Sequence, residues 1–404
     1  MTRILFTGGT IFDGSGADPV EGDVVVEGDR IVGVGTGLDA DESVDCSGTT
    51  LLPGLIDCHV HVVVSDVSLT SRLQDPFSYQ FYLAKQNLER TLATGITTVR
   101  DASGADLGVK LAVDNGLIAG PRMLIAISLI SQTGGHGDGW MPSGKCVPLF
   151  EPHPGRPAAI ADGPDELRKL AREILRAGAD VLKVASTGGV LSPTDDPRHT
   201  QFTTEELRVL VTEAAMQGRH VMAHAQGSEG IKNAVRAGVR SIEHGIYLDD
   251  EAIELMLANG TWLVPTLVAP VSVIRAAEAG SAVAESAVRK AKAVLDIHHE
   301  SMRKAVDAGV RIAMGTDSGV GPHGTNLEEL PLMAACGMKP ADVLAATTSS
   351  AADLLGLGDQ LGRIAEGYRA DLTIVRGDAY DLAGLPTAIS QVWKDGRQVV
   401  VNKL

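Results

Sequence analysis

The sequence predicts an α/β fold in which a (β/α)8 TIM barrel carries a small β-sandwich built from both ends of the chain. The middle of the chain repeats one pattern: an amphipathic stretch, a small residue with glycine, and then a short run rich in β-branched residues. Both ends instead contain short β-rich runs between glycine and aspartate turns. We therefore expect residues 54–357 to form the barrel domain, and residues 1–53 and 358–404 to form the sandwich together.

One repeat is clearest between Asp165 and Val184. Its apolar residues fall on one helical stripe that ends at Gly178, and a buried strand follows. The next repeat opens with Thr203 and Glu206, which have the spacing of a capping box. The same pattern predicts eight strands, at residues 51–61, 96–101, 121–126, 179–184, 219–224, 239–244, 261–266 and 310–317.

An open, doubly wound sheet has the same alternation of strands and helices and is the alternative to the barrel. In a dinucleotide-binding sheet of that kind, a Gly-x-Gly-x-x-Gly phosphate turn follows the first strand; this sequence has none there, which favours the barrel. Two long excursions, residues 128–163 after the third strand and residues 268–301 after the seventh, have the length of lids or specificity elements.

Composition excludes several classes of protein. The 404 residues include 35 basic and 51 acidic side chains, which gives a formal net charge of −16. Nucleic acids and anionic membranes both bind clustered lysine and arginine, so we expect neither partner. Four cysteines without a Cys-x-x-Cys pair argue against a disulfide scaffold. Since no signal-peptide core or membrane-spanning apolar run occurs, we expect a cytoplasmic protein.

Candidate metal ligands stand at the ends of the predicted strands. His59 and His61 lie two apart on the first strand, so both side chains point to one face at the carboxyl end, where barrel enzymes keep their active sites. Histidine and aspartate are direct ligands for zinc or a similar ion. The ends of four further strands add Lys183, His224, His244 and Asp317.

Lys183 is the unusual member of this set. A buried lysine paired with an acid is the ordinary interpretation of such a residue. Beside metal cations, however, a desolvated lysine has a lowered pKa, and its neutral amine adds carbon dioxide to form a carbamate whose two oxygens bridge two cations. The four positive charges of two divalent ions would face three negative charges, from Asp317, the carbamate and a bridging hydroxide. The sequence therefore predicts a binuclear centre.

These residues and their flanking segments, Leu51–His61 and Gly315–Gly319, resemble the amidohydrolase superfamily with a carboxylated-lysine binuclear centre. The resemblance covers nearly the whole chain, including the sandwich formed by both ends. It implies two divalent metal ions, carbon dioxide as the carbamate on Lys183, and a homo-oligomer. The same ligands suit manganese, cobalt or iron, but zinc is the metal we expect.

The resemblance also implies a role for each ligand. His59, His61 and Asp317 hold the buried metal, His224 and His244 hold the more exposed one, and Lys183 bridges the two. Two cations generate a bridging hydroxide at neutral pH, and one of them polarises the scissile carbonyl. Asp317 is placed to accept the proton of that hydroxide and to deliver it to the leaving amine.

Two further residues narrow the branch of the superfamily. His136 lies in a glycine-rich loop after the third strand, and Tyr247 follows the sixth. Both patterns resemble the prolidase-like carboxypeptidases, a group that includes enzymes similar to ochratoxinase, which implies that both residues donate hydrogen bonds to the substrate carbonyl oxygen. We also expect the backbone amides of Gly188 and Gly189 to receive a substrate carboxylate, and His323 to contact the substrate.

The function that we expect is hydrolysis of an amide bond in a small molecule, which releases a C-terminal amino acid from a dipeptide or an N-acyl amino acid. An ochratoxin-like amide is a special case. The alternative within the superfamily is a hydrolase of cyclic amides, imidazolones or other C–N or C–O bonds, although an imidazolonepropionase would lack the bridging Lys183. The alternative outside catalysis is a metal-free assembly protein, which would lack several of the ligands.

The other histidines have ordinary interpretations. We expect His153, His199 and His220 to be structural or exposed, and His298 with its neighbour His299 to form a solvated pair on a helix. Asp57 lies two residues before the first ligand. It is expected to orient a neighbouring ligand without binding the metal itself.

Overall fold

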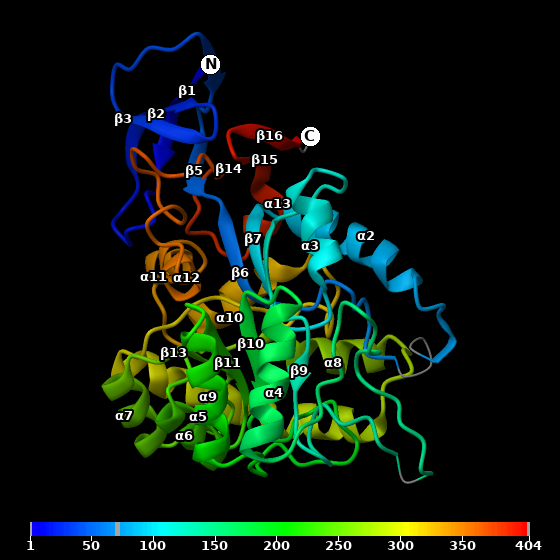
Figure 1. Ribbon diagram of the computed structural model, residues 1–404. Coiled ribbons are helices and arrows are strands. Elements are labelled where there is room, and N and C mark those ends of the chain that lie inside the picture. Colours follow the sequence, from blue (N-terminus) through cyan, green and yellow to red (C-terminus); the bar gives the residue numbers. More distant parts are fainter. Residues whose placement is uncertain (1, 69–72, 142, 402–404) are drawn as a thin grey trace.

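The computed structural model describes residues 2–68, 73–141 and 143–401 and contains the expected alternation of helices and parallel strands in the middle of the chain (Figure 1). The α/β class is therefore confirmed. The parallel strands in the middle of the chain form two hydrogen-bonded sheets. One sheet contains β6 (Leu55–Val60), β7 (Ile96–Asp101) and β8 (Arg122–Ile125), and the other contains β9 (Leu129–Ile130), β10 (Val181–Ala185), β11 (His220–Ala225), β12 (Ser241–His244) and β13 (Trp262–Val264).

Backbone hydrogen bonds connect the two sheets on both sides. On one side, the amide of Asp180 donates to the carbonyl of Ile125 at 2.8 Å. On the other side, residues 310–318 lie between β13 and β6, since Leu263 donates to Arg311 and Cys58 donates to Met314. This segment, the eighth predicted strand, makes isolated bridges rather than a continuous strand. The bonds support a closed barrel, which stays a prediction.

Helices follow the strands as the sequence patterns predicted. Thr203 and Glu206 form the capping box that starts α5, and Gly178, with φ +100°, follows the end of α4. Among the described residues, no helix is long and apolar enough to cross a membrane. The helices are α2 (Tyr79–Ala93), α3 (Leu107–Asp114), α4 (Gly163–Arg176), α5 (Thr204–Ala215), α6 (Ser228–Ala237), α7 (Asp250–Asn259), α8 (Val268–Glu278), α9 (Glu285–Ala308), η1 (Asn326–Glu328), α10 (Glu329–Ala335), α11 (Pro340–Ala346), α12 (Ser349–Leu355) and α13 (Leu385–Ala388).

Both ends of the chain share one sheet, which lies at one end of the molecule beside the labelled termini (Figure 1). The joining strand pair is β5 with β14, which run antiparallel, and Phe6 packs edge-on against Trp393 in a separate core. The division of this sheet into the two layers of a sandwich, and the domain boundaries given above, stay predictions. The strands are β1 (Arg3–Ile11), β2 (Val20–Glu27), β3 (Arg30–Gly35), β4 (Glu42–Asp45), β5 (Thr49–Pro53), β14 (Leu372–Arg376), β15 (Ile389–Lys394) and β16 (Arg397–Val401).

The excursion after β13 is helical and consists of α8 and most of α9, which pack against each other. Glu329 in α10 holds the start of α8. Its two carboxylate oxygens accept the backbone amides of Leu267 and Val268 at 2.8 and 2.7 Å. Burial raises the pKa of Glu329 to about 8, although both amides act in the opposite direction. The first turn of α8 therefore depends on a fully buried acceptor pair.

We predict that Glu329→Gln lowers the free energy of unfolding by about 1–3 kcal/mol, because the amide group has one acceptor oxygen for two backbone donors. Urea unfolding with chelator present measures the change. Glu328→Gln is the control: Glu328 pairs with Arg275 at the surface, where loss of a pair costs at most about 1 kcal/mol. Equal effects of the two substitutions would contradict the capping role.

Candidate metal centre and active site

A single cavity collects the predicted metal ligands at the carboxyl ends of the strands. His59, Lys183, His224 and His244 come from four different strands, while His61 directly follows β6 and Asp317 lies in the bridged segment between β13 and β6. His136 lines the same cavity. The ligand candidates in the wall are His59, His61, Lys183, His224, His244 and Asp317.

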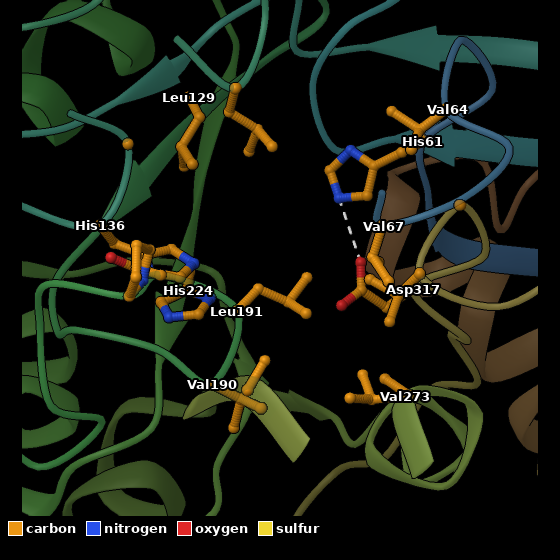
Figure 2. Close-up of a pocket in the computed structure, with 18 of the residues that line it drawn as sticks. His61, Val64, Val67, Leu129, His136, Val190, Leu191, His224, Val273 and Asp317 are labelled. Carbon is orange, nitrogen blue, oxygen red and sulfur yellow. Dashed lines mark ion pairs between the residues drawn. The ribbon is translucent and has the colours of Figure 1, made fainter. Parts of the chain in front are cut away.

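His59 and His61 both turn their Nε2 atoms toward Asp317. The distances to Asp317 Oδ1 are 3.4 and 3.1 Å, and Figure 2 shows the second contact as a dashed line. The other ring nitrogens are occupied: Nδ1 of His59 lies 2.8 Å from Glu243 Oε2, and Nδ1 of His61 lies 2.9 Å from the carbonyl of Ser103. In both rings, Nδ1–H donates to an oxygen that can only accept. The lone pair on Nε2 therefore remains free to bind a metal.

His224 and His244 are held in the same manner. Nε2 of His224 donates to the carbonyl of Gly188 at 3.1 Å, and Nδ1 of His244 lies 2.7 Å from the hydroxyl of Thr266. The free nitrogen is therefore Nδ1 in the first ring and Nε2 in the second. Ligand atoms of His59, His244 and Asp317 all lie within 4.8 Å of one another, close enough to share an ion.

Burial sets the charge state of these ligands. It lowers the pKa values of His59, His224 and His244 well below the ordinary value, which leaves the rings neutral and able to coordinate a cation. Burial also opposes the charge on His61, but the hydrogen bond and charge of Asp317 outweigh it and raise that pKa. The pKa of Asp317 is lowered because His59 and His61 overcome the effect of burial.

Lys183 is 2% exposed, and its Nζ has no hydrogen-bond partner among the described residues. Burial lowers its pKa to about 8, although Glu243 and Asp317 act in the opposite direction. An unpaired buried amine beside four histidines and a carboxylate is costly unless another group completes its environment. The donor set and this unpaired amine together fit a metal centre that includes a modified lysine.

Two ligands lie in a backbone conformation that L-residues rarely adopt. His244 has φ +75° and Asp317 has φ +59°, and Thr266, which holds the ring of His244, has φ +53°. Each such residue costs about 1–3 kcal/mol, which other contacts must offset. Asp57 holds the backbone next to two of the ligands, since its carboxylate accepts the amides of His59 and of Thr316, the residue before Asp317. This position behind a ligand is the one that the sequence predicted for Asp57.

Beneath the ligands lies a buried ionic network that sequence reasoning missed. Glu243 accepts hydrogen bonds from His59 on one oxygen and from Arg100 and Ser241 on the other. Arg100 also donates to the carbonyl of Cys58 at 2.7 Å. The only signal in the sequence was a charged residue, Arg100 or Glu243, within each of two short predicted strands, β7 and β12.

We predict that Glu243→Leu lowers the free energy of unfolding by about 3–5 kcal/mol, because it leaves the buried Arg100 without its anionic partner. Glu243→Gln keeps one acceptor oxygen and should cost less. Urea unfolding in chelator separates this effect from metal binding. Glu254→Gln, at an exposed position on α7, should change stability by less than about 0.5 kcal/mol. A loss for Glu243→Leu no larger than for this control would contradict the prediction.

His136 is part of the cavity wall. Its ring lies beside that of His224 (Figure 2). The two rings are stacked, with centroids 4.2 Å apart and an interplanar angle of 15°. Nδ1 of His136 lies 3.1 Å from Asp195 Oδ2, a partner that sequence reasoning missed. Tyr247 is half-buried and packs beside Val190 and Ile246, and it is not among the described residues that line the cavity. The structure thus brings His136, but not Tyr247, to the predicted site.

Three other predicted substrate contacts differ in the structure. The amide of Gly188 donates to the carbonyl of His199, and the amide of Gly189 donates to Asp195 Oδ1. Neither amide can receive a substrate carboxylate without losing these bonds. His323 is buried behind His61, and its ring contacts backbone carbonyls of residues 61 and 64 instead of the cavity. In all three cases, hydrogen bonds within the protein occupy the groups that were expected to contact the substrate.

The prediction for His298 was wrong in one respect. The residue is helical, but it is 1% exposed, and its Nε2 lies 2.9 Å from the carbonyl of His244. A helix that packs on the loop after β12 buries it, whereas local sequence suggested a solvated face. His199 and His220 are exposed, and His153 packs against aromatic rings, as expected.

The sequence pattern of the Amidohydrolase family matches residues 50–402. Ochratoxinase from Aspergillus niger is 37% identical over 365 residues, which cover 86% of this chain and 75% of that protein. The chain belongs to the amidohydrolase family, in the branch similar to prolidases and ochratoxinase, and is a hydrolase that acts on C–N bonds.

Solved structures agree with this assignment. A Xaa-Pro dipeptidase with methionine bound in its active site has a TM-score of 0.90 and 35% identity, and covers 98% of this chain and 100% of its own. A prolidase complexed with N-methylphosphonate-L-proline has a TM-score of 0.92 and 34% identity, and covers 99% and 100%. These similarities support an amidohydrolase that acts on amides or peptides.

Proposed function

We propose that this protein cleaves the amide bond of a dipeptide or an N-acyl amino acid and releases the C-terminal amino acid. The observation that carries the proposal is the cavity itself, whose wall combines the six ligand candidates and His136 with apolar side chains. Such a cavity presents a scissile carbonyl to its polar groups while it buries an apolar part of the substrate. The wall includes Val64, Val67, Leu129, Val190, Leu191 and Val273 (Figure 2).

The residues fit two divalent ions. We assign His59, His61 and Asp317 to one ion, His224 and His244 to the other, and a carbamate on Lys183 to both. When bound, the ions would lower the pKa of a water molecule and polarise the substrate carbonyl, and zinc suits these ligands. The homo-oligomeric state, the cytoplasmic location and the closed barrel belong to the same proposal.

Asp317 moves the proton in this proposal. Its carboxylate is ionised at neutral pH, since His59 and His61 lower its pKa. One of its oxygens would accept a proton from the attacking water and then donate it to the leaving nitrogen. His136 orients the substrate. Because Asp195 holds Nδ1 of His136, Nε2 is left for a hydrogen bond to the carbonyl oxygen.

A second candidate function is hydrolysis of an amide that has no carboxylate, such as a cyclic amide or an arylamide. Among the described residues that line the cavity there is no arginine, and Lys183 is the single lysine. The described part of the cavity wall therefore offers a substrate carboxylate no lysine or arginine side chain except Lys183, which is already assigned to the metals. Direct comparison of substrates separates the two functions.

Metal content tests the centre. We predict that purified protein binds about two zinc ions per chain and that Lys183→Ala loses most of this metal, because the alanine variant has no carbamate to bridge the ions. Elemental analysis after dialysis measures the ratio, with Lys292→Ala, an exposed lysine of α9, as the matched control. A full complement of metal in Lys183→Ala would remove Lys183 from the centre.

Substrate range tests the function. We predict that dipeptides and N-acyl amino acids with an apolar C-terminal residue are hydrolysed, because the apolar side chains of the cavity bury that residue. Release of free amino acid by the zinc-loaded enzyme is the measurement. Hydrolysis of carboxylate-free amides without hydrolysis of dipeptides would favour the second candidate. The absence of turnover on both classes would contradict the proposed function.

A further inference from the structure

One face of helix α9 carries three polar side chains. These side chains point toward the loops of the candidate site. Lys290, His298 and Ser301 follow one another at intervals of eight and three residues, so they project from the same side of the helix. The residues between them on this face, Ala291 and Val294, are buried. A buried polar group is costly unless it is paired, and each of these three donors is paired with a backbone carbonyl.

Lys290 holds the segment that carries the partner of His136. Its Nζ donates to the carbonyls of Gly189, Ser192 and Asp195 at 3.0, 2.7 and 2.5 Å. Three acceptors from seven consecutive residues around one ammonium group fix the conformation of this segment. Its last residue, Asp195, holds the ring of His136 against His224.

His298 and Ser301 hold the loop after β12. Nε2 of His298 donates to the carbonyl of His244 at 2.9 Å, and Oγ of Ser301 donates to the carbonyl of Ile246 at 2.6 Å. These contacts lie where the backbone of His244 has φ +75°, so they help to hold a conformation that is unfavourable in isolation. The ring nitrogen of His244 that Thr266 leaves free keeps its direction only while this backbone stays in place.

We propose that Lys290, His298 and Ser301 are positioning residues, and that this face of α9 fixes the half of the site that contains His136, His224 and His244. The proposal rests on the proposed function for its catalytic consequence, but its effect on metal binding does not. The same helix lines the cavity through Ala287. Helix α9 therefore lines the cavity and also holds the loops that carry His244 and the partner of His136.

Zinc binding tests the part of the proposal that concerns His298. Zinc-free protein is titrated with zinc in competition with a chromophoric chelator. His298→Leu should weaken the binding of one ion by at least about tenfold, as loss of a group that supports a metal ligand does. His298→Gln keeps an N–H donor and should recover most of the affinity. Binding by His298→Leu equal to that of the parent protein would overturn this assignment.

Ser301→Ala is the milder variant, and it carries the test if His298→Leu does not fold. It removes one hydrogen bond and should weaken the binding of one ion by about fivefold. Lys292→Met, on the exposed face of α9, should bind zinc as the parent protein does. Unchanged zinc affinity in Ser301→Ala would count against the positioning role of this face.

Lys290 is tested on the substrate found for the enzyme. Lys290→Met should keep its zinc but raise KM or lower kcat so that kcat/KM falls at least about tenfold, and Lys290→Arg should recover part of the loss. Kinetics of the zinc-loaded variants, with Lys292→Met as control, measure the change. Parental kcat/KM in Lys290→Met would overturn its role. If no substrate is found, the proposed function fails, while the zinc titration still decides the role of His298.

Discussion

The site depends on one constraint: each of the four histidines has one ring nitrogen bonded to the protein, so that a single nitrogen remains for a metal. Three of the partners are a carboxylate or a backbone carbonyl, which accept and cannot donate, and they therefore fix the tautomer as well as the direction of the ring. Burial keeps three of the rings neutral. A neutral, oriented imidazole has little conformational freedom left to lose when it binds a cation.

This constraint explains why the network under the ligands is ionic. One carboxylate oxygen of Glu243 accepts the Nδ1 proton of His59, and the buried carboxylate is paired with Arg100 through its other oxygen. Apolar packing would stabilise the fold at least as well, but it would leave the ring of His59 free to turn. The desolvated ion pair in the interior therefore serves to orient one ligand rather than to stabilise the fold.

The positions of the ligands could be predicted from the sequence because they follow from local pattern. Alternation along a strand places His59 and His61 on one face, and parallel strands bring their carboxyl ends to the same edge. The partners could not be predicted in this way, since Glu243 lies 184 residues from His59 and Lys290 lies 95 residues from Asp195. Such pairs are defined by tertiary packing, and the local sequence does not show which residues pair.

The same distinction accounts for the substrate residues that were misplaced. The glycine-rich segment after β10 looks free in sequence, but the loop folds back and satisfies the amides of Gly188 and Gly189 internally. Its side chains Val190 and Leu191 then face the cavity in place of its amides. Because Lys290 holds that fold from α9, a change in the excursion after β13 acts on substrate binding and on His136 together. Under the proposed function, specificity is therefore expected to vary at apolar positions of the cavity wall, whose side chains make none of the hydrogen bonds that hold the loops.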